Sequence, residues 1–169
     1  MRLVAAGFRR PNLSFKVQNC QGGKDVKLAI IRKLLKTPVS GATIIYAATR
    51  QAVDELSALP EVRGYHAGMS NEERSSAQEY FMNHPSPVLA ATNAFGMGID
   101  RPDVRRVIHY QLPGSLEAYY QEAGRAGRDG ESAECLLLFS YADRYIQNFL
   151  IDMNNPPPSL IRSVYQGHR

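Results

Sequence analysis

Short apolar runs alternate with amphipathic stretches along most of the chain. The runs are predicted to be buried strands, because a strand covered on both faces needs few polar residues. They lie at residues 42–48, 87–92, 104–110 and 133–139, with a shorter strand at 61–65 and a polar–apolar alternating edge strand at 14–18. Helices are expected at residues 24–36, 49–59, 70–83 and from residue 115 onward. The repeated β-α-β order predicts an α/β domain in which right-handed crossovers place helices on both faces of a parallel sheet.

Local signals support several of these helices. Apolar residues recur at helical spacing in the first helix. Thr49 can cap the second helix, and Ser70 with Glu73 three residues later forms a capping box for the third. Two further helices are expected from Tyr141 onward, separated by the prolines at 156–158.

Composition adds limits to this picture. With 169 residues, 44% of them hydrophobic and 21% charged, the chain suits a single domain with its own core. It has no apolar run of about 18 residues, so no membrane span is predicted. Cys20 and Cys135 are too few for an all-cysteine zinc site; they are expected to be reduced thiols, and no metal site is predicted. The net charge of +4 permits nucleic-acid binding without indicating it.

Two polar segments follow predicted strands, where open parallel sheets bind their ligands. Thr49 and Arg50 begin a helix whose amides, together with the guanidinium, could hold a phosphate; alternatively Thr49 only caps the helix and Arg50 is solvated. His66 and Gly68 form a tight turn whose backbone amides could approach a polyanion. Alternatively, His66 is a packed or capping histidine.

A third segment, residues 91–100, reads ATNAFGMGID. Its two glycines, Gly96 and Gly98, need an unusual backbone path, and Asp100 after the turn could accept hydrogen bonds from a ribose. Such short Gly-x-Gly elements are common, so this segment alone indicates little.

The fourth segment, residues 119–130, reads YYQEAGRAGRDG. Arg125 and Arg128 would lie on one face if the preceding helix continued, and they have the chemistry to meet triphosphate oxygens. The structural alternative is a pair of arginines held by carboxylates nearby in sequence, namely Glu122, Asp129 or Glu131.

Taken in order, these segments resemble the RecQ family of DNA helicases, within the larger superfamily of RecA-like helicases. The resemblance covers residues 7 to 143, and the fourth segment is its most specific part. The matching stretches are GFRRPNL at 7–13, IY at 45–46 with Arg50, YHAGM at 65–69, ATNAFGMGID at 91–100, VIHY at 107–110 leading to Pro113, and YYQEAGRAGRDG at 119–130. The resemblance implies a RecA-like three-layer α/β/α domain with a mostly parallel central sheet.

In that family two RecA-like domains clamp ATP, and single-stranded DNA crosses both. The resemblance implies that Arg128 is the arginine finger, that Arg125 links nucleotide state to domain closure, and that Gln121 orients the arginine segment or a bound water. Gly98 and Asp100 would belong to the nucleotide site, with Asp100 facing the ribose. The residues implied to contact DNA phosphates are Thr49, Arg50, His66, Gly68, Thr92 and Asn93.

The resemblance also implies cofactors and partners. The chain contains no Gly-x-x-x-x-Gly-Lys-Ser/Thr loop and no Asp-Glu-x-His run, so the Mg²⁺ ligands and the water-activating acid are expected on the first RecA-like domain. The intact parent would use ATP and Mg²⁺ on single-stranded or partly duplex DNA, whereas this fragment alone would bind no cofactor and hydrolyse no ATP. The parent would be in the bacterial cytoplasm (nucleoid) or the eukaryotic nucleus.

The same resemblance predicts how the chain is divided. Residues 1–13 would be a leading linker from a missing first RecA-like domain, and residues 14–143 the RecA-like C-terminal helicase domain. Residues 144–169 would be a helical tail toward a missing C-terminal module. Because this tail contains no cysteine, zinc ligands would lie beyond Arg169 or be absent from the parent.

Three functions are compatible with the residues. The first is the second half of an ATP-driven 3′-to-5′ DNA helicase motor, and the second is a non-catalytic, helicase-like module that binds nucleic acid. The paired arginines favour the motor, because DNA binding alone requires no arginine finger. The third, a Rossmann-like nucleotide enzyme, is disfavoured because no Gly-x-Gly-x-x-Gly follows the first strand.

Overall fold

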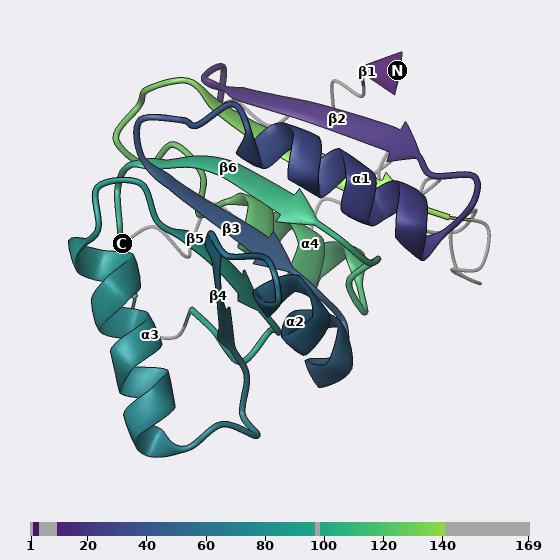
Figure 1. The fold of residues 1–169 in the computed structure, drawn as a ribbon. Coiled ribbons are helices and arrows are strands. Elements are labelled where there is room, and N and C mark those ends of the chain that lie inside the picture. Colours follow the sequence, from purple (N-terminus) through teal and green to yellow (C-terminus); the bar gives the residue numbers. More distant parts are fainter. Residues whose placement is uncertain (1, 4–9, 97–98, 141–169) are drawn as a thin grey trace.

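The computed structural model describes residues 2–3, 10–96 and 99–140, which form one seven-stranded sheet flanked by four helices (Figure 1). The expected tail helices, and the whole segment 144–169, lie outside the described residues. In chain order the elements are β1 (Arg2–Leu3), β2 (Leu13–Asn19), α1 (Lys24–Leu35), β3 (Ala42–Tyr46), α2 (Arg50–Ser57), β4 (Val62–Tyr65), α3 (Asn71–Asn83), β5 (Val88–Ala91), β6 (Val104–His109), α4 (Leu116–Ala123) and β7 (Ala133–Phe139).

The strands follow the order β1-β2-β7-β6-β3-β5-β4, and every neighbouring pair is parallel except β1 with β2. The expected mostly parallel sheet is therefore confirmed. The prediction that residues 14–18 form an edge strand needs a correction. The short antiparallel strand β1 pairs with Lys16 and Val17, so β2 is second from the edge.

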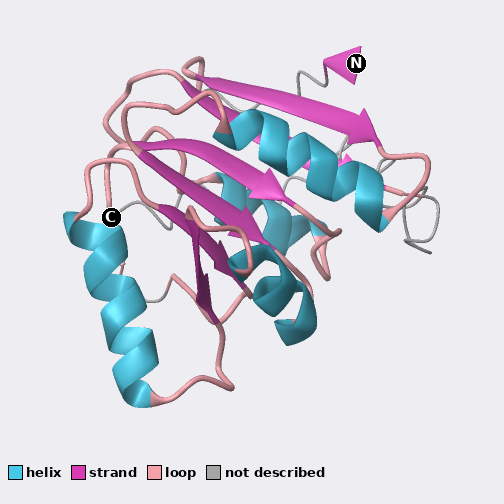
Figure 2. Ribbon diagram, in the orientation of Figure 1, coloured by secondary structure: helices cyan, strands magenta, loops and turns pink. Residues whose placement is uncertain are grey.

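Helices cover both faces of the sheet, which gives the expected three layers (Figure 2). Successive residues of a strand point to opposite faces, and β3 shows how this divides the core. Ile45 packs in the same cluster as Ile31 of α1 and Leu56 of α2. Its neighbour Ile44 packs in the cluster that contains Phe81 of α3 and Ala123 of α4.

Side-chain caps fix the starts of three helices as their sequences indicate. The Oγ of Thr49 accepts a hydrogen bond from the Ala52 N–H at 3.1 Å, and both bonds of the Ser70–Glu73 capping box are present. Ser115 caps α4 in the same way. Among the described residues, no helix has the length and apolar character needed to cross a membrane.

Candidate functional site

Three neighbouring strands, β3, β5 and β4, end at one edge of the sheet and bring most of the predicted DNA-contacting residues together. Thr49 and Arg50 follow β3, and both side chains are exposed. Because the Thr49 oxygen caps α2, the capping alternative is confirmed for this residue. The exposed guanidinium of Arg50 and the start of α2 lie at this edge, where a phosphate could reach both.

The turn after β4 is shaped by His66. Its Nδ1 accepts a hydrogen bond from the Gly68 N–H at 3.1 Å, so the ring proton is assigned to Nε2, which lies 2.9 Å from an Asp54 carboxylate oxygen. The side chain is buried, and both ring nitrogens have partners, so His66 is a packed histidine that orders the turn. A Cβ at Gly68 would lie 3.1 Å from Nη1 of Arg50. Arg50 therefore packs over the turn.

Thr92 and Asn93 follow β5, between the other two strand ends. The Thr92 N–H donates to the Tyr65 carbonyl at 3.3 Å, which ties the start of this segment to the turn at His66. Thr92 is buried, whereas Asn93 is exposed. The six residues predicted to contact DNA thus share the carboxyl edge of β3, β4 and β5.

The two arginines belong to a different part of the molecule. They lie in the arginine loop, residues 124–132, which connects α4 to β7. The Gly127 N–H of this loop donates to the Val104 carbonyl at 2.8 Å, where β6 begins. This segment therefore precedes a strand and packs at the amino ends of the sheet, unlike the other three segments.

The condition for Arg125 and Arg128 to share a helix face, that the preceding helix continues through both, is not met. Helix α4 ends at Ala123, with Gly124 as its C-cap, and Gly127 has a positive φ of 56°. A left-handed residue reverses the chain, so the loop folds back on itself. Arg125 and Arg128 nevertheless line one small cavity, because the loop rather than a helix brings them together.

Arg125 is held by the turn that follows β5. Gly96 has a φ of 125°, and a Cβ there would lie only 2.2 Å from Nη2 of Arg125, so the guanidinium occupies the space that a side chain would take. Its Nη1 donates to the Ile99 carbonyl at 3.3 Å. Burial raises the pKa of the nearby Tyr46 phenol far above its usual value, and the positive charge of Arg125 opposes that rise.

Arg128 pairs with Asp100, with its Nη1 2.7 Å from Oδ1. The carboxylates that the sequence offered as structural partners for the two arginines were Glu122, Asp129 and Glu131. Of these, Glu122 pairs instead with His109 and Asp129 with Arg105. The side chains of Arg128 and Asp100 are 31% and 77% exposed, so this pair is weak and open to exchange with a ligand. The predicted finger and the predicted ribose-facing acid therefore lie on one surface.

The two remaining predicted site residues are Gln121 and Gly98. Gln121 is exposed on α4, one turn before the arginine loop. Gly98 lies outside the described residues.

Sequence reasoning missed a buried hydrogen bond between a histidine and a glutamate near the loop. His109, at the end of β6, places Nε2 2.7 Å from Oε2 of Glu122 on α4, and its ring stacks on Tyr46 at a centroid distance of 5.5 Å. His109 is 1% exposed. The sequence did contain a signal for this contact: His109 interrupts the otherwise apolar run 107–110, and a polar residue in a buried strand needs a hydrogen-bond partner.

Other missed residues join backbone segments that are far apart in the sequence. Arg101 donates to the carbonyl of His84 at 2.8 Å and pairs with Asp103, which joins the end of α3 to the start of β6. Arg10 and Asn12 hydrogen-bond to carbonyls of the arginine loop itself. Both lie in the GFRRPNL stretch, which carried no assigned role.

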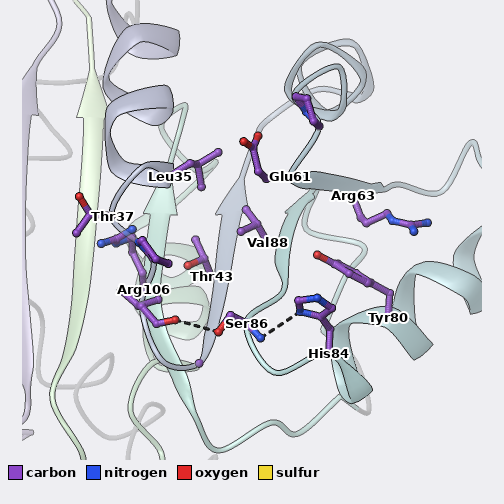
Figure 3. A pocket seen from close by; sticks show the side chains of 14 residues that line it. Leu35, Thr37, Thr43, Glu61, Arg63, Tyr80, His84, Ser86, Val88 and Arg106 are labelled. Carbon is purple, nitrogen blue, oxygen red and sulfur yellow. Dashed lines mark hydrogen bonds between the residues drawn. The ribbon is translucent and has the colours of Figure 1, made fainter.

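A separate cavity of about 390 Å³ lies where β3, β4 and β5 begin, at the opposite end from their carboxyl ends (Figure 3). Tyr80, His84 and Arg63 come together there, with the Arg63 guanidinium 5.0 Å from the Tyr80 ring centroid. The Ser86 N–H donates to Nδ1 of His84 at 3.1 Å. The lining includes none of the predicted site residues, and ligands of parallel sheets bind at the other edge.

Comparison with solved structures supports the fold. A chain from the crystal structure of the E. coli DEAD-box protein SrmB, bound to regulator of ribonuclease activity A, matches with a TM-score of 0.67 at 24% identity. The match covers 80% of this chain and 82% of that chain. At this identity the likeness shows the RecA-like α/β fold and nothing more.

Curated relatives are more similar in sequence. The ATP-dependent DNA helicase RecQ of Bacillus subtilis is 44% identical over 89% of this chain and 26% of its own length. The RecQ-like DNA helicase BLM of Xenopus laevis is 41% identical over 84% of this chain and 11% of its own length. A putative ATP-dependent RNA helicase of Acanthamoeba polyphaga mimivirus is 40% identical over 91% of this chain and 28% of its own length. The chain thus spans between 11% and 28% of the length of these relatives.

The family model for the helicase conserved C-terminal domain matches residues 26–130, which include all four polar segments. The chain therefore belongs to the helicase conserved C-terminal domain family, and within it to the RecQ type of DNA helicases.

Proposed function

We propose that this chain is the second motor domain of an ATP-dependent 3′-to-5′ DNA helicase and supplies Arg128 as an arginine finger to ATP held by a first RecA-like domain. The observation that carries the proposal is the exposed Arg128–Asp100 pair beside Arg125. A guanidinium whose partner is a solvated carboxylate can exchange that partner for phosphate oxygens at small cost.

Each residue of this surface then has a task. ATP with Mg²⁺, the Mg²⁺ ligands lying on the first domain, supplies the phosphoryl group that is transferred to water. Arg128 neutralises the charge that develops on that group, and Arg125 stays fixed against Gly96 and Ile99 as the two domains close. Asp100, released from Arg128, faces the ribose, and Gly98 belongs to the same nucleotide site. Gln121 orients the arginine loop or a bound water.

The carboxyl edge serves single-stranded or partly duplex DNA in this proposal. Exposed Arg50 and Asn93 and the start of α2 at Thr49 contact phosphates, while the ordered turn at Gly68 and buried Thr92 and His66 contribute from the strand ends. Phosphate contacts carry no base information, so binding is expected to be independent of sequence and sensitive to salt.

Residues 92–100 connect the two surfaces. The segment begins beside the turn at His66, through the bond from the Thr92 N–H to Tyr65, and ends at Asp100 beside Arg128. A displacement at the DNA edge can therefore reach the arginines through fewer than ten residues of continuous backbone.

The proposal is tested by DNA-stimulated ATP hydrolysis. Arg128→Ala in the intact parent should lower turnover by about 10³-fold or more, as loss of an arginine finger does, with a smaller effect on ATP binding. Arg32→Ala is the matched control, because it removes the same charge from an exposed position on α1. Near-normal turnover for Arg128→Ala would refute the finger assignment.

The isolated chain gives a second comparison. It should hydrolyse no ATP, whereas the intact parent should be active with DNA. Hydrolysis by the chain alone would contradict the half-motor proposal. DNA binding by the parent without any hydrolysis would instead favour the non-catalytic binding module.

A further inference from the structure

Arg10 and Asn12, which precede β2, hydrogen-bond to the backbone of the arginine loop. Arg10 donates three hydrogen bonds to loop carbonyls: Nη1 to Gly124 at 2.8 Å, and Nη2 to Ala126 at 2.8 Å and to Gly127 at 3.0 Å. The guanidinium thus holds the backbone immediately before and after Arg125. These contacts join residues more than 100 positions apart in the sequence.

Asn12 holds the same loop one step further along. Its Nδ2 donates to the carbonyls of Gly127 at 2.8 Å and Glu131 at 3.0 Å, which lie on either side of Arg128. The approach is close, because a Cβ at Gly127 would lie 2.6 Å from that nitrogen. The backbone of Asn12 also takes part, accepting from the Ala133 N–H at 2.9 Å where β7 begins.

The loop needs such external support. It contains no helix or strand between Ala123 and Ala133, and its turn at Gly127 has a left-handed backbone conformation. Five side-chain hydrogen bonds to main-chain oxygens fix its path without engaging the side chains of Arg125 and Arg128. A planar guanidinium can serve several carbonyls at once in a fixed geometry, which the single ammonium of lysine cannot do.

We propose that Arg10 and Asn12 are positioning residues for the arginine finger, acting through the backbone of the arginine loop, and that they couple the loop to the segment leading into β2. This inference rests on the proposed role of Arg128. Because both residues precede β2, a shift of that segment changes the carbonyl contacts and with them the placement of Arg125 and Arg128. A displacement of about 1 Å at a reacting centre can cost about 100-fold in rate.

The test is a double-mutant cycle in the intact helicase. Arg10→Gln should lower ATP turnover by about 10- to 100-fold and weaken binding of ADP with aluminium fluoride, a mimic of the transferring phosphoryl group, with little change in binding of ADP alone. Arg10→Lys keeps the charge but loses the fork, so it should not restore turnover. Asn12→Ala, which removes two bonds rather than three, should give a smaller effect of the same kind.

The background of Arg128→Ala separates positioning from general stability. If Arg10 acts through the finger, Arg10→Gln should change turnover by less than about twofold once Arg128 is gone. Equal fold-losses in both backgrounds would overturn the proposal and indicate a merely structural contact. Lys16→Gln is the control, since it removes an ion pair with Glu134 between β2 and β7 that does not touch the loop.

Two further outcomes are informative. If the Arg10→Gln protein does not fold, the same cycle with Asn12→Ala tests the proposal. For a partly folded variant, the ratio of its affinities for the mimic and for ADP is used, because this ratio does not depend on the folded fraction. If Arg128→Ala itself leaves turnover unchanged, the finger assignment fails and the role of these two residues fails with it. If Arg128→Ala lowers turnover as expected, but Arg10→Gln lowers it by the same factor in both backgrounds, only the present inference is overturned.

Discussion

Replacing Gly96 by alanine tests whether the turn after β5 exists to admit the guanidinium of Arg125. Gly96 has a φ of 125°, in a region that residues with a side chain rarely adopt. A Cβ at this position would lie 2.2 Å from Nη2, 2.3 Å from Cζ and 2.8 Å from Nε of Arg125. The substitution therefore strains the backbone and also displaces a flexible side chain.

The two costs can be separated in magnitude. Backbone strain of this kind costs about 1–3 kcal/mol. The guanidinium must retreat by about 1 Å or more to reach ordinary contact distance, and it can turn toward solvent. The side-chain part is then limited to its lost bond with the Ile99 carbonyl, about 1 kcal/mol. Gly96→Ala should lower the free energy of unfolding by between about 2 and 4 kcal/mol in total.

Urea unfolding of the chain, with and without Arg125→Ala, measures both parts. In the Arg125→Ala background the cost of Gly96→Ala should fall by about 1 kcal/mol, because only backbone strain remains. In the intact parent, the displaced guanidinium should lower ATP turnover by about 100-fold. A cost below about 0.5 kcal/mol, or equal costs in both backgrounds, would refute the reasoning, since the glycine would then not be needed for Arg125.

Three other perturbations have defined outcomes. Thr92→Ala in the parent should weaken DNA binding and DNA stimulation more than basal turnover; the opposite pattern would place Thr92 in the nucleotide cleft. Ser70→Ala should cost about 1 kcal/mol in urea unfolding through loss of the capping box, while Ser75→Ala, exposed within the same helix, should cost nothing. Burial raises the pKa of Tyr120 and of Cys135 each to about 12. The native state holds both groups neutral after the unfolded chain has begun to ionise, so stability should be full below pH of about 9 and fall as the pH rises toward about 12. Tyr120→Phe should make that fall shallower, and an unchanged pH profile would contradict the contribution of Tyr120.

The strands and helices were largely predictable because their signals are local. The apolar runs at 42–48 and 133–139 became β3 and β7, and Thr49 and Ser70 cap the helices they were expected to cap. One interior position was not predictable. Lys27 is 4% exposed, and its ammonium donates to the Tyr110 carbonyl at 2.7 Å, a contact that depends on how α1 crosses the end of β6.

The carboxyl-edge residues were also grouped correctly by sequence, since a parallel sheet places the ends of β3, β4 and β5 together. The arginine loop could not be placed by that rule. Arg125 and Arg128 would share a face only if the helix continued, but it ends at Gly124, and Asp100 rather than a neighbour in sequence pairs with Arg128. Whether Arg128 is a finger remains a prediction.

Periodicity, caps and glycine positions determined the order of elements, because each depends on residues a few positions apart. The motifs also indicated the family, since a motif is recognised from its residues and their spacing without coordinates. Only the tertiary structure decided which carbonyls Arg10 and Asn12 hold, that Gly96 makes room for Arg125, and that Glu122 turns inward to His109. Those contacts join residues 13 to about 120 positions apart, and such pairings depend on the packing of the whole sheet and its helices.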